Sequence, residues 1–193
     1  MKNLTETLHH IPGTRREYVA FSGANATTPY LSDTQQKYQR KLFASVDEVL
    51  DRCDLHDGMT VSFHHAFREG DKVINYVMDK LAQHGLKGIT LASSSLMSCN
   101  APLIEHIRSG VIGKIYTSGM RGELADAISH GLMDEPVQIH SHGGRVNLIQ
   151  KGEIAIDVAF LAVSCSDEYG NASGNGGTSQ CGSLGYAMVD AQY

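Results

Sequence analysis

Two hydrophobic patterns alternate along the chain from residue 42 onward. In residues 42–53 and 71–85 the apolar side chains recur at helical spacing, which is typical of amphipathic helices. Between them, residues 60–64 (TVSFH) are a short run rich in β-branched and aromatic side chains, which indicates a strand. Gly85 stands where the second helix would need a C-cap. The pattern therefore predicts a helix, a strand and a second helix in succession.

The alternation of strand and helix continues to residue 164. The expected elements are strands at 87–95, 113–119, 137–141 and 156–164, and helices at 101–110 and 122–131. Strands joined by helices of this length pair in parallel through right-handed crossovers. The predicted fold class is therefore α/β, with a mostly parallel sheet and helices on both of its faces.

The amino-terminal part of the chain follows neither pattern. Residues 1–40 are polar without a sustained apolar period, so we expect an extended arm that leads into a helix and packs on a partner. Residues 41–193 are expected to form one α/β domain. A chain of 193 residues with 41% hydrophobic and 19% charged residues has the composition of a globular protein with a single substantial core.

Charge, cysteines and hydropathy exclude several classes of function. The net charge is −5 and the basic residues are scattered among acidic ones, so nucleic acid is not an expected partner. The four cysteines have no C-x-x-C spacing, which indicates reduced thiols rather than a zinc site or a disulfide framework. No apolar run approaches the ~20 residues that a membrane span needs, and the start lacks an apolar signal. These features predict a cytoplasmic protein that does not enter the membrane.

Small and polar residues gather in the segments that follow the predicted strands. Ligands of open parallel sheets bind outside the carboxyl ends of the strands. Backbone N–H groups and hydroxyls in such loops suit an anionic ligand. The loops in question are residues 63–70, 93–100, 117–122, 140–145 and 164–177.

Four histidines in these loops allow different interpretations. His64 and His65 are adjacent, so in an extended segment they face opposite sides and do not readily share one metal ion. His140 and His142 would face the same side if residues 140–142 were extended, which is an arrangement that zinc enzymes use. The histidines could also donate hydrogen bonds or hold the shape of a loop beside backbone amides that bind an oxyanion.

A metal-dependent hydrolase is the alternative that His140 and His142 raise, with Asp167 or Glu168 supplying an oxygen ligand. No third ligand has a characteristic spacing, and an H-x-H motif alone is a weak signal. We therefore expect no metal site.

Other candidate motifs in the loops are incomplete. Residues 93–95 (SSS) could offer hydroxyls to an anion, but G-x-S-x-G is absent, so serine catalysis is not expected. The glycine-rich residues 170–185 lack the G-K-[ST] of a P-loop. Arg68, Arg121 and Arg145 could pair with carboxylates through their planar guanidinium groups, or remain solvated charges on the surface.

Several consecutive motifs together resemble the alpha chain of citrate lyase. They read, in order, DGMTVSFHHAFREGD, ITLASSSL, PLIEHIRSGVIGKIYTSGMRG, PVQIHSHGGRVNLIQKGEIAIDVAFLAVSCSDEYGNASG and CGSLGYAMVDA. The resemblance covers nearly all of the chain from about residue 38, and the shared order makes it more specific than any single motif.

The resemblance implies a fold of the CoA-transferase type and the activity of a citrate CoA-transferase. In this reaction citrate replaces acetate on the CoA-like thioester of an acyl carrier protein, which gives citryl-carrier and acetate. The CoA-like group is then a substrate, and no covalently bound cofactor is expected in this chain. The implied partners are the acyl carrier protein and the citryl-lyase chain of a citrate-fermenting complex, together with citrate, acetate and further copies of this chain.

Citrate lyase alpha chains are more than twice this long and consist of two similar halves, with the nucleophilic glutamate of related transferases in the second half. The glutamates here have no matching context, so none is assigned as the nucleophile; they are Glu69, Glu105, Glu123, Glu135, Glu153 and Glu168. We therefore expect an amino-terminal half that is inactive alone. The alternative is a non-catalytic module that binds CoA-like ligands or lyase partners.

The expected substrate and CoA contacts come from the strand-end loops that the resemblance covers. They are Phe63, His64, His65, Ser93, Ser94, Ser95, His140, His142, Gly143, Gly144, Arg145, Gly170, Asn171 and Gly174.

Overall fold

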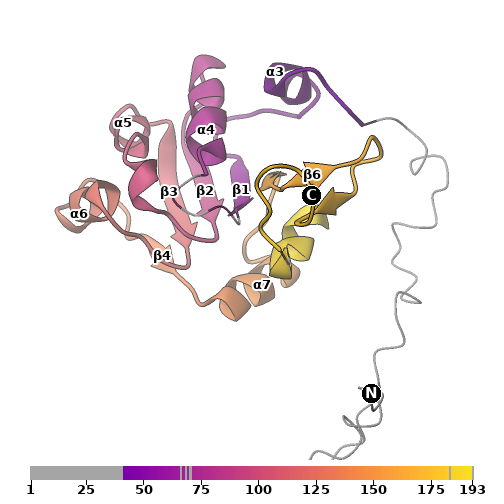
Figure 1. Ribbon diagram of the computed structural model, residues 1–193. Coiled ribbons are helices and arrows are strands. Elements are labelled where there is room, and N and C mark those ends of the chain that lie inside the picture. The colour runs from indigo at the N-terminus through magenta and orange to yellow at the C-terminus, as the bar shows by residue number, and fades with distance from the viewer. Residues whose placement is uncertain (1–40, 66, 68, 70, 183, 193) are drawn as a thin grey trace, which may run out of the picture. The chain divides into compact units, whose positions relative to one another are not determined.

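A parallel sheet of five strands forms the centre of the protein (Figure 1). The computed structural model describes residues 41–65, 67, 69, 71–182 and 184–192. The strand order is β4-β3-β2-β1-β5, and each neighbouring pair is parallel. The strands are β1 (Thr60–His65), β2 (Ile89–Ser93), β3 (Ile112–Thr117), β4 (Gln138–Ile139) and β5 (Val158–Ala162). The α/β prediction is confirmed, and the expected arm of residues 1–40 lies outside the described residues.

Four helices connect successive strands of the sheet as crossovers: α4 (Val73–Gln83), α5 (Leu103–Arg108), α6 (Glu123–Ser129) and α7 (His142–Gln150). Helix α3 (Val46–Leu50) precedes β1, the 3₁₀ helix η3 (Ser98–Asn100) precedes α5, and the 3₁₀ helix η4 (Gly185–Gln192) follows the last strand. Gly85 ends α4 as predicted, but one position later: His84 is the C-cap residue, and Gly85 follows it in the left-handed conformation with a φ of 82°. A small antiparallel pair, β6 (Cys165–Ser166) and β7 (Ala172–Ser173), follows β5.

The sequence pattern did not predict α7. The strand expected at 137–141 is only Gln138–Ile139, because Ser141 caps α7 and the helix begins at the next residue. Two glycines, Gly143 and Gly144, occupy the first turn of α7 and weaken any helical signal there. The Ser141 cap therefore contributes more to where α7 begins than the helix propensity of the first residues of α7 does.

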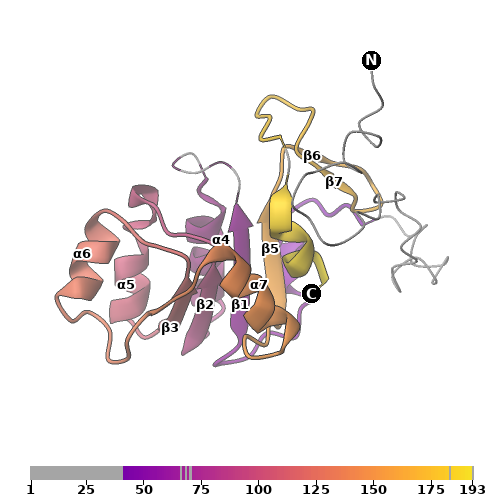
Figure 2. The same cartoon turned by 90° about the horizontal axis from the view of Figure 1, so that it is seen from below.

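Two apolar cores lie on opposite faces of the sheet (Figure 2). Side chains alternate between the faces of a strand, so Phe63 and Leu91 point toward α4 and α5. Ala92 points the other way and packs with Ile149 of α7 and Val189 of η4. The prediction of helices on both faces is confirmed. None of the helices in the described part of the chain combines the length and hydropathy that crossing a membrane would require.

Phe63 is the side chain on which the larger core can best be tested. Its ring is 1% exposed and stacks on Phe160 with 5.6 Å between ring centroids. Replacing Phe63 with alanine should lower the free energy of unfolding by about 3–5 kcal/mol, because the packed core cannot close the cavity. Urea unfolding followed by circular dichroism measures this loss. Met188, at 74% exposure, provides the control, since Met188→Ala should change stability by less than ~0.5 kcal/mol. Equal losses in both variants would contradict the described core.

Candidate functional site

Four polar residues lie side by side at the carboxyl edge of the sheet. Continuing the registers of neighbouring strands by one or two residues aligns His64, Ser94, Ser118 and His140 across β1 to β4, and we call these four residues the polar row. The backbone holds this alignment: the Ser118 N–H donates to the Ser94 carbonyl at 3.1 Å, and the His140 N–H donates to the Thr117 carbonyl at 2.9 Å. The sheet therefore brings together three residues that the sequence had singled out and adds Ser118.

The polar row has unused hydrogen-bonding capacity. Ser118 Oγ and His140 Nε2 are buried and have no hydrogen-bond partner among the residues that the structure describes. The His140 ring also stacks on Tyr116, with 6.1 Å between ring centroids. Buried polar atoms are nearly always paired in folded proteins, so such atoms at a strand edge are suited to bind a polar ligand. The signal for Ser118 in the sequence was its place at the carboxyl end of a predicted strand, like that of Ser94.

Helix α7 begins directly beside this edge. The Ser141 hydroxyl caps the helix by accepting a hydrogen bond from the Gly144 N–H at 3.0 Å. His142 is exposed and is the first helical residue, and Gly143 lies next to it. The amino terminus of a helix offers N–H groups and a positive end of the dipole, which suit a carboxylate.

The same cap corrects the premise of the zinc hypothesis. Residues 140–142 do not form a strand: β4 ends at Ile139, and although Ser141 keeps an extended backbone, His142 is already the first residue of α7. His140 and His142 therefore do not share the face of a strand, as the hypothesis assumed. In residues 41–192, leaving aside the positions without a described structure, no group of three His, Cys, Asp or Glu side chains could hold a metal ion.

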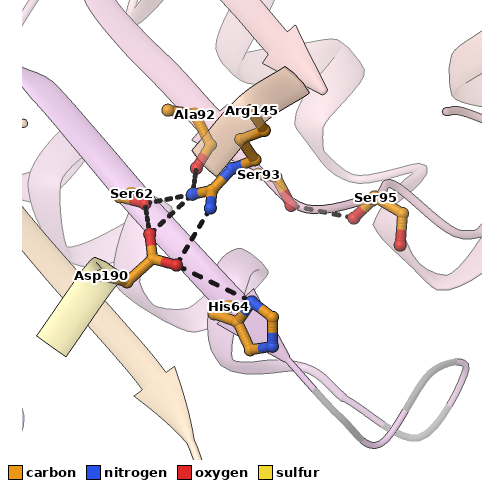
Figure 3. A network of polar contacts seen from close by, with 7 residues as sticks. All are labelled: Ser62, His64, Ala92, Ser93, Ser95, Arg145 and Asp190. Carbon is orange, nitrogen blue, oxygen red and sulfur yellow. Dashed lines mark hydrogen bonds and ion pairs between the residues drawn. The ribbon is translucent and has the colours of Figure 1, made fainter. Parts of the chain in front are cut away.

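Beneath the polar row, a buried ion pair connects α7 to η4 (Figure 3). The side chains of Arg145 and Asp190 are 2% and 0% exposed. Arg145 Nη1 donates to Asp190 Oδ2 at 2.9 Å, and Nη2 donates to Oδ1 at 2.6 Å. Two parallel charge-assisted hydrogen bonds of this kind fix both position and angle. Arg145 was considered as a partner for a carboxylate, and the carboxylate that it binds belongs to its own chain.

Ser62 and His64 bring strand β1 into the same network. Arg145 Nη2 also donates to Ser62 Oγ at 2.7 Å, and the Ser62 hydroxyl donates to Asp190 Oδ1. His64 Nδ1 lies 3.7 Å from Asp190 Oδ2, on the other side of the carboxylate. Sequence reasoning did not single out Ser62 or Asp190, because Ser62 lies inside a predicted strand and the contact joins residues 128 positions apart.

Two other candidate residues on β1 and β2, Phe63 and Ser93, stabilise the fold. Phe63 lies in the core, on the opposite face of the sheet from His64. His65 ends β1, and its side chain lies outside the described part of the chain. Ser93 is fully buried and donates its hydroxyl to the Ser95 carbonyl at 2.8 Å, which shapes the turn after β2.

The glycine-rich segment packs against the end of β5. Gly174 is buried, and a Cβ atom there would collide with the Gly182 carbonyl oxygen. A Cβ atom at Gly177 would lie 2.6 Å from the Ser164 carbonyl oxygen. Glycine is therefore required for close backbone contact at both positions. This packing borders a pocket of about 440 Å³ that is lined by Phe67, Val163, Ser164, Thr178 and Ser179.

Gly170 and Asn171 lie in the exposed turn between β6 and β7. Asp167 accepts hydrogen bonds there from the Asn171 side chain at 2.6 Å and from the Tyr169 and Asn171 N–H groups at 2.9 Å. The hydrogen bonds from Asn171, followed by those from the backbone, lower the pKa of the Asp167 carboxyl. The zinc hypothesis used the Asp167 carboxylate as a metal ligand, but its oxygens instead accept the hydrogen bonds that stabilise this turn.

The Arg145–Asp190 pair gives a test of the described site. Arg145→Met should lower the free energy of unfolding by about 3–5 kcal/mol, because it leaves the Asp190 carboxylate buried without its partner. In the double variant Arg145→Met/Asp190→Leu, most of that stability should return, since no charge is left buried. Urea unfolding of both variants measures the difference.

The exposed pair of Arg108 and Glu105, joined at 2.5 Å, is the control. Arg108→Met should change the free energy of unfolding by less than ~1 kcal/mol, as is usual for surface pairs. A loss for Arg145→Met as small as that for Arg108→Met would show that Asp190 is not enclosed as described.

Comparisons with known proteins agree on one family. The family model described as citrate lyase, alpha subunit (CitF), matches residues 39–193. The citrate lyase alpha chain of Klebsiella pneumoniae is 59% identical over 90% of this chain and 34% of its own length. That of Haemophilus influenzae is 62% identical over 80% of this chain and 31% of its own length.

A solved structure agrees with these relatives. It is described as the alpha subunit of citrate lyase from Streptococcus mutans in complex with citrate. The TM-score is 0.78 at 51% identity, over 81% of this chain and 31% of that one. The chain thus spans about a third of the length of the relatives that it matches. With its family model matched from residue 39 to residue 193, this chain belongs to the citrate lyase alpha subunit family.

Proposed function

We propose that this chain forms one side of the active site of a citrate CoA-transferase. The observation that carries the proposal is the family match over residues 39–193, supported by a relative with 51% identity that was solved in complex with citrate. The strand-edge polar row and the start of α7 supply hydrogen-bond donors at the place where parallel sheets bind ligands. These features suit a carboxylate substrate.

The proposed chemistry divides the exchange into steps that a carboxylate nucleophile can perform. A glutamate carboxylate attacks the acetyl thioester, the C–S bond breaks, and a thiolate and an anhydride form. The thiolate then attacks the glutamyl carbonyl, which releases acetate and leaves a glutamyl thioester. A carboxylate of citrate repeats the sequence in reverse and leaves as the citryl thioester. Each tetrahedral intermediate carries an oxyanion, which positioned N–H groups stabilise.

The residues of this chain would bind and orient rather than attack. We assign the polar row and the Gly143 amide to the carboxylates and oxyanions, while the Gly144 N–H holds the Ser141 cap. The pocket of about 440 Å³ beside Ser164 is within the usual size range of small-molecule sites and is the proposed place for the pantetheine arm. Gly174 would serve by keeping the glycine-rich backbone close to that pocket.

The nucleophile is proposed to come from outside the described residues. All glutamates in the described part of the chain have exposed side chains: Glu48, Glu69, Glu105, Glu123, Glu135, Glu153 and Glu168. None of them therefore has the enclosed setting that a nucleophilic carboxylate in a water-excluded site would need. The proposal also places this chain in the cytoplasm as a homo-oligomer, beside an acyl carrier protein that carries the CoA-like thioester and a citryl-lyase chain.

A reconstitution assay tests the proposed function. The chain is mixed with acetyl-CoA and citrate, with or without a separate polypeptide that comprises the remaining two thirds of the Klebsiella pneumoniae relative. Acetate release is expected only from the mixture of both polypeptides, because each supplies one side of the site. The second polypeptide alone is the control.

Two results would oppose this proposal in different ways. Acetate release by the chain alone would show that the nucleophile lies within it. A mixture that co-purifies as a complex and releases no acetate would favour the non-catalytic binding module.

A further inference from the structure

Asn175 is the only asparagine of the sequence that a glycine follows. It lies just after β7 in the glycine-rich segment, and it is exposed. The side-chain amide of an asparagine can be attacked by the backbone nitrogen of the next residue, because the two groups are held close together in the same chain. A glycine at that next position hinders the attack least, since it has no Cβ atom. The sequence Asn175–Gly176 therefore suits a covalent change of the backbone.

The two reacting groups of this pair are available in the structure. Within the described part of the chain, no hydrogen bond engages the Asn175 side-chain amide or the Gly176 N–H. Ring closure turns the Asn175 carbonyl, which accepts hydrogen bonds from the Ser173 hydroxyl at 3.0 Å and the Cys165 thiol at 3.2 Å. Both donors are neutral, both contacts lie at the surface, and a thiol is a weak donor. Breaking these contacts therefore costs little.

Asp57 and Gly58 show the opposite arrangement. An aspartate before a glycine can close the same ring, and its side chain has the shape of asparagine. Here, however, Asp57 Oδ1 accepts a hydrogen bond from the Lys87 N–H at 2.8 Å, and the Gly58 N–H donates to the Lys87 carbonyl at 2.9 Å. Both reacting groups are thus held by the same residue. The difference between the two pairs comes from the tertiary structure, because a glycine follows in both.

We propose that Asn175 is a site of spontaneous deamidation. The Gly176 nitrogen forms a bond to Asn175 Cγ, the bond from Cγ to Nδ2 breaks, and the Gly176 proton leaves with Nδ2 as ammonia. Water then opens the resulting succinimide at either of its carbonyls. The products are aspartate and isoaspartate, in which the main chain runs through the side chain. This modification needs no partner other than water and does not rest on the proposed transferase function.

Isoaspartate does not fit the packing around Asn175. It lengthens the backbone by a methylene group and adds a negative charge. A Cβ atom at Gly176 would lie 3.1 Å from Cys165 Sγ, and a Cβ atom at Gly177 would lie 2.6 Å from the Ser164 carbonyl oxygen. A segment without room for a Cβ atom cannot take up a longer backbone unless it moves. We expect the modified segment to separate from the end of β5 and to widen the pocket beside Ser164.

Mass spectrometry of the aged chain tests the modification. The chain is incubated in mildly alkaline buffer and digested, and deamidation adds about 1 Da to the peptide that contains Asn175. Asn171 is the internal control, because alanine follows it and its side chain donates to Asp167 at 2.6 Å. Conversion should be at least about tenfold faster at Asn175 than at Asn171. Asn175→Gln should remove the signal, since the longer side chain closes a ring far less readily.

The variant Asp57→Asn separates the effect of structure from that of sequence. It places a second asparagine before a glycine, with the Gly58 N–H still bound to Lys87. In the folded chain we expect conversion at position 57 to be about tenfold slower than at Asn175, and in urea the two rates should become similar. Conversion of Asn175 in the folded chain no faster than at Asn171 or at position 57 would overturn the proposal.

Hydrogen exchange measures the structural consequence. After ageing, the backbone amides of residues 164–182 should exchange faster than in fresh protein, because the displaced segment loses its contacts. Residues 73–83 of α4 are the control and should exchange at the same rate in both samples. Unchanged exchange in residues 164–182 of a fully converted sample would show that the segment accommodates isoaspartate, contrary to the proposed displacement.

Discussion

The bidentate ion pair between Arg145 and Asp190 is the interaction on which the site depends. It lies on the face of the sheet opposite α4 and joins α7 and η4 to strand β1 through Ser62. A buried ion pair adds little net stability compared with apolar packing, because both charges lose their hydration. Its geometry is nevertheless specific, because the planar guanidinium donates two parallel hydrogen bonds only to a carboxylate that lies in its plane and faces it. The pair therefore contributes more to the relative position of α7, η4 and β1 than to the free energy of unfolding.

The position of α7 follows from that constraint and from its cap. Ser141 ends the extended backbone after β4, and Arg145 directs the first turn of the helix toward the sheet. The amides of Gly143 and Gly144 thus begin beside His140 and the rest of the polar row. An apolar face on the far side of the sheet holds the strands in register. One face of the sheet is apolar, whereas the other combines a smaller apolar core with a buried polar network that lies beside the polar row.

Much of the fold could be predicted because it depends on local patterns. The runs TVSFH and ITLAS are apolar enough to be buried, and the helices between the strands have clear faces, so the parallel sheet followed from the sequence. The prediction missed α7, whose first turn contains two glycines, and it extended the preceding strand to residue 141. The same error made His140 and His142 appear to be paired. Within the site, His64, Ser94 and His140 were found because polar residues at the carboxyl ends of predicted strands lie at the ligand-binding edge.

The sequence by itself determined where the five strands of the parallel sheet lie along the chain, which edge of the sheet is polar, and to which family the chain is similar. Each of these depends on residues that are close along the chain or on the order of motifs. Only the tertiary structure decided that Arg145 faces Asp190 rather than solvent and that Ser118 completes the polar row. It also decided which nitrogen of His64 faces a carboxylate. These contacts join residues far apart in sequence, and no local period or motif encodes the distance between two side chains on different elements.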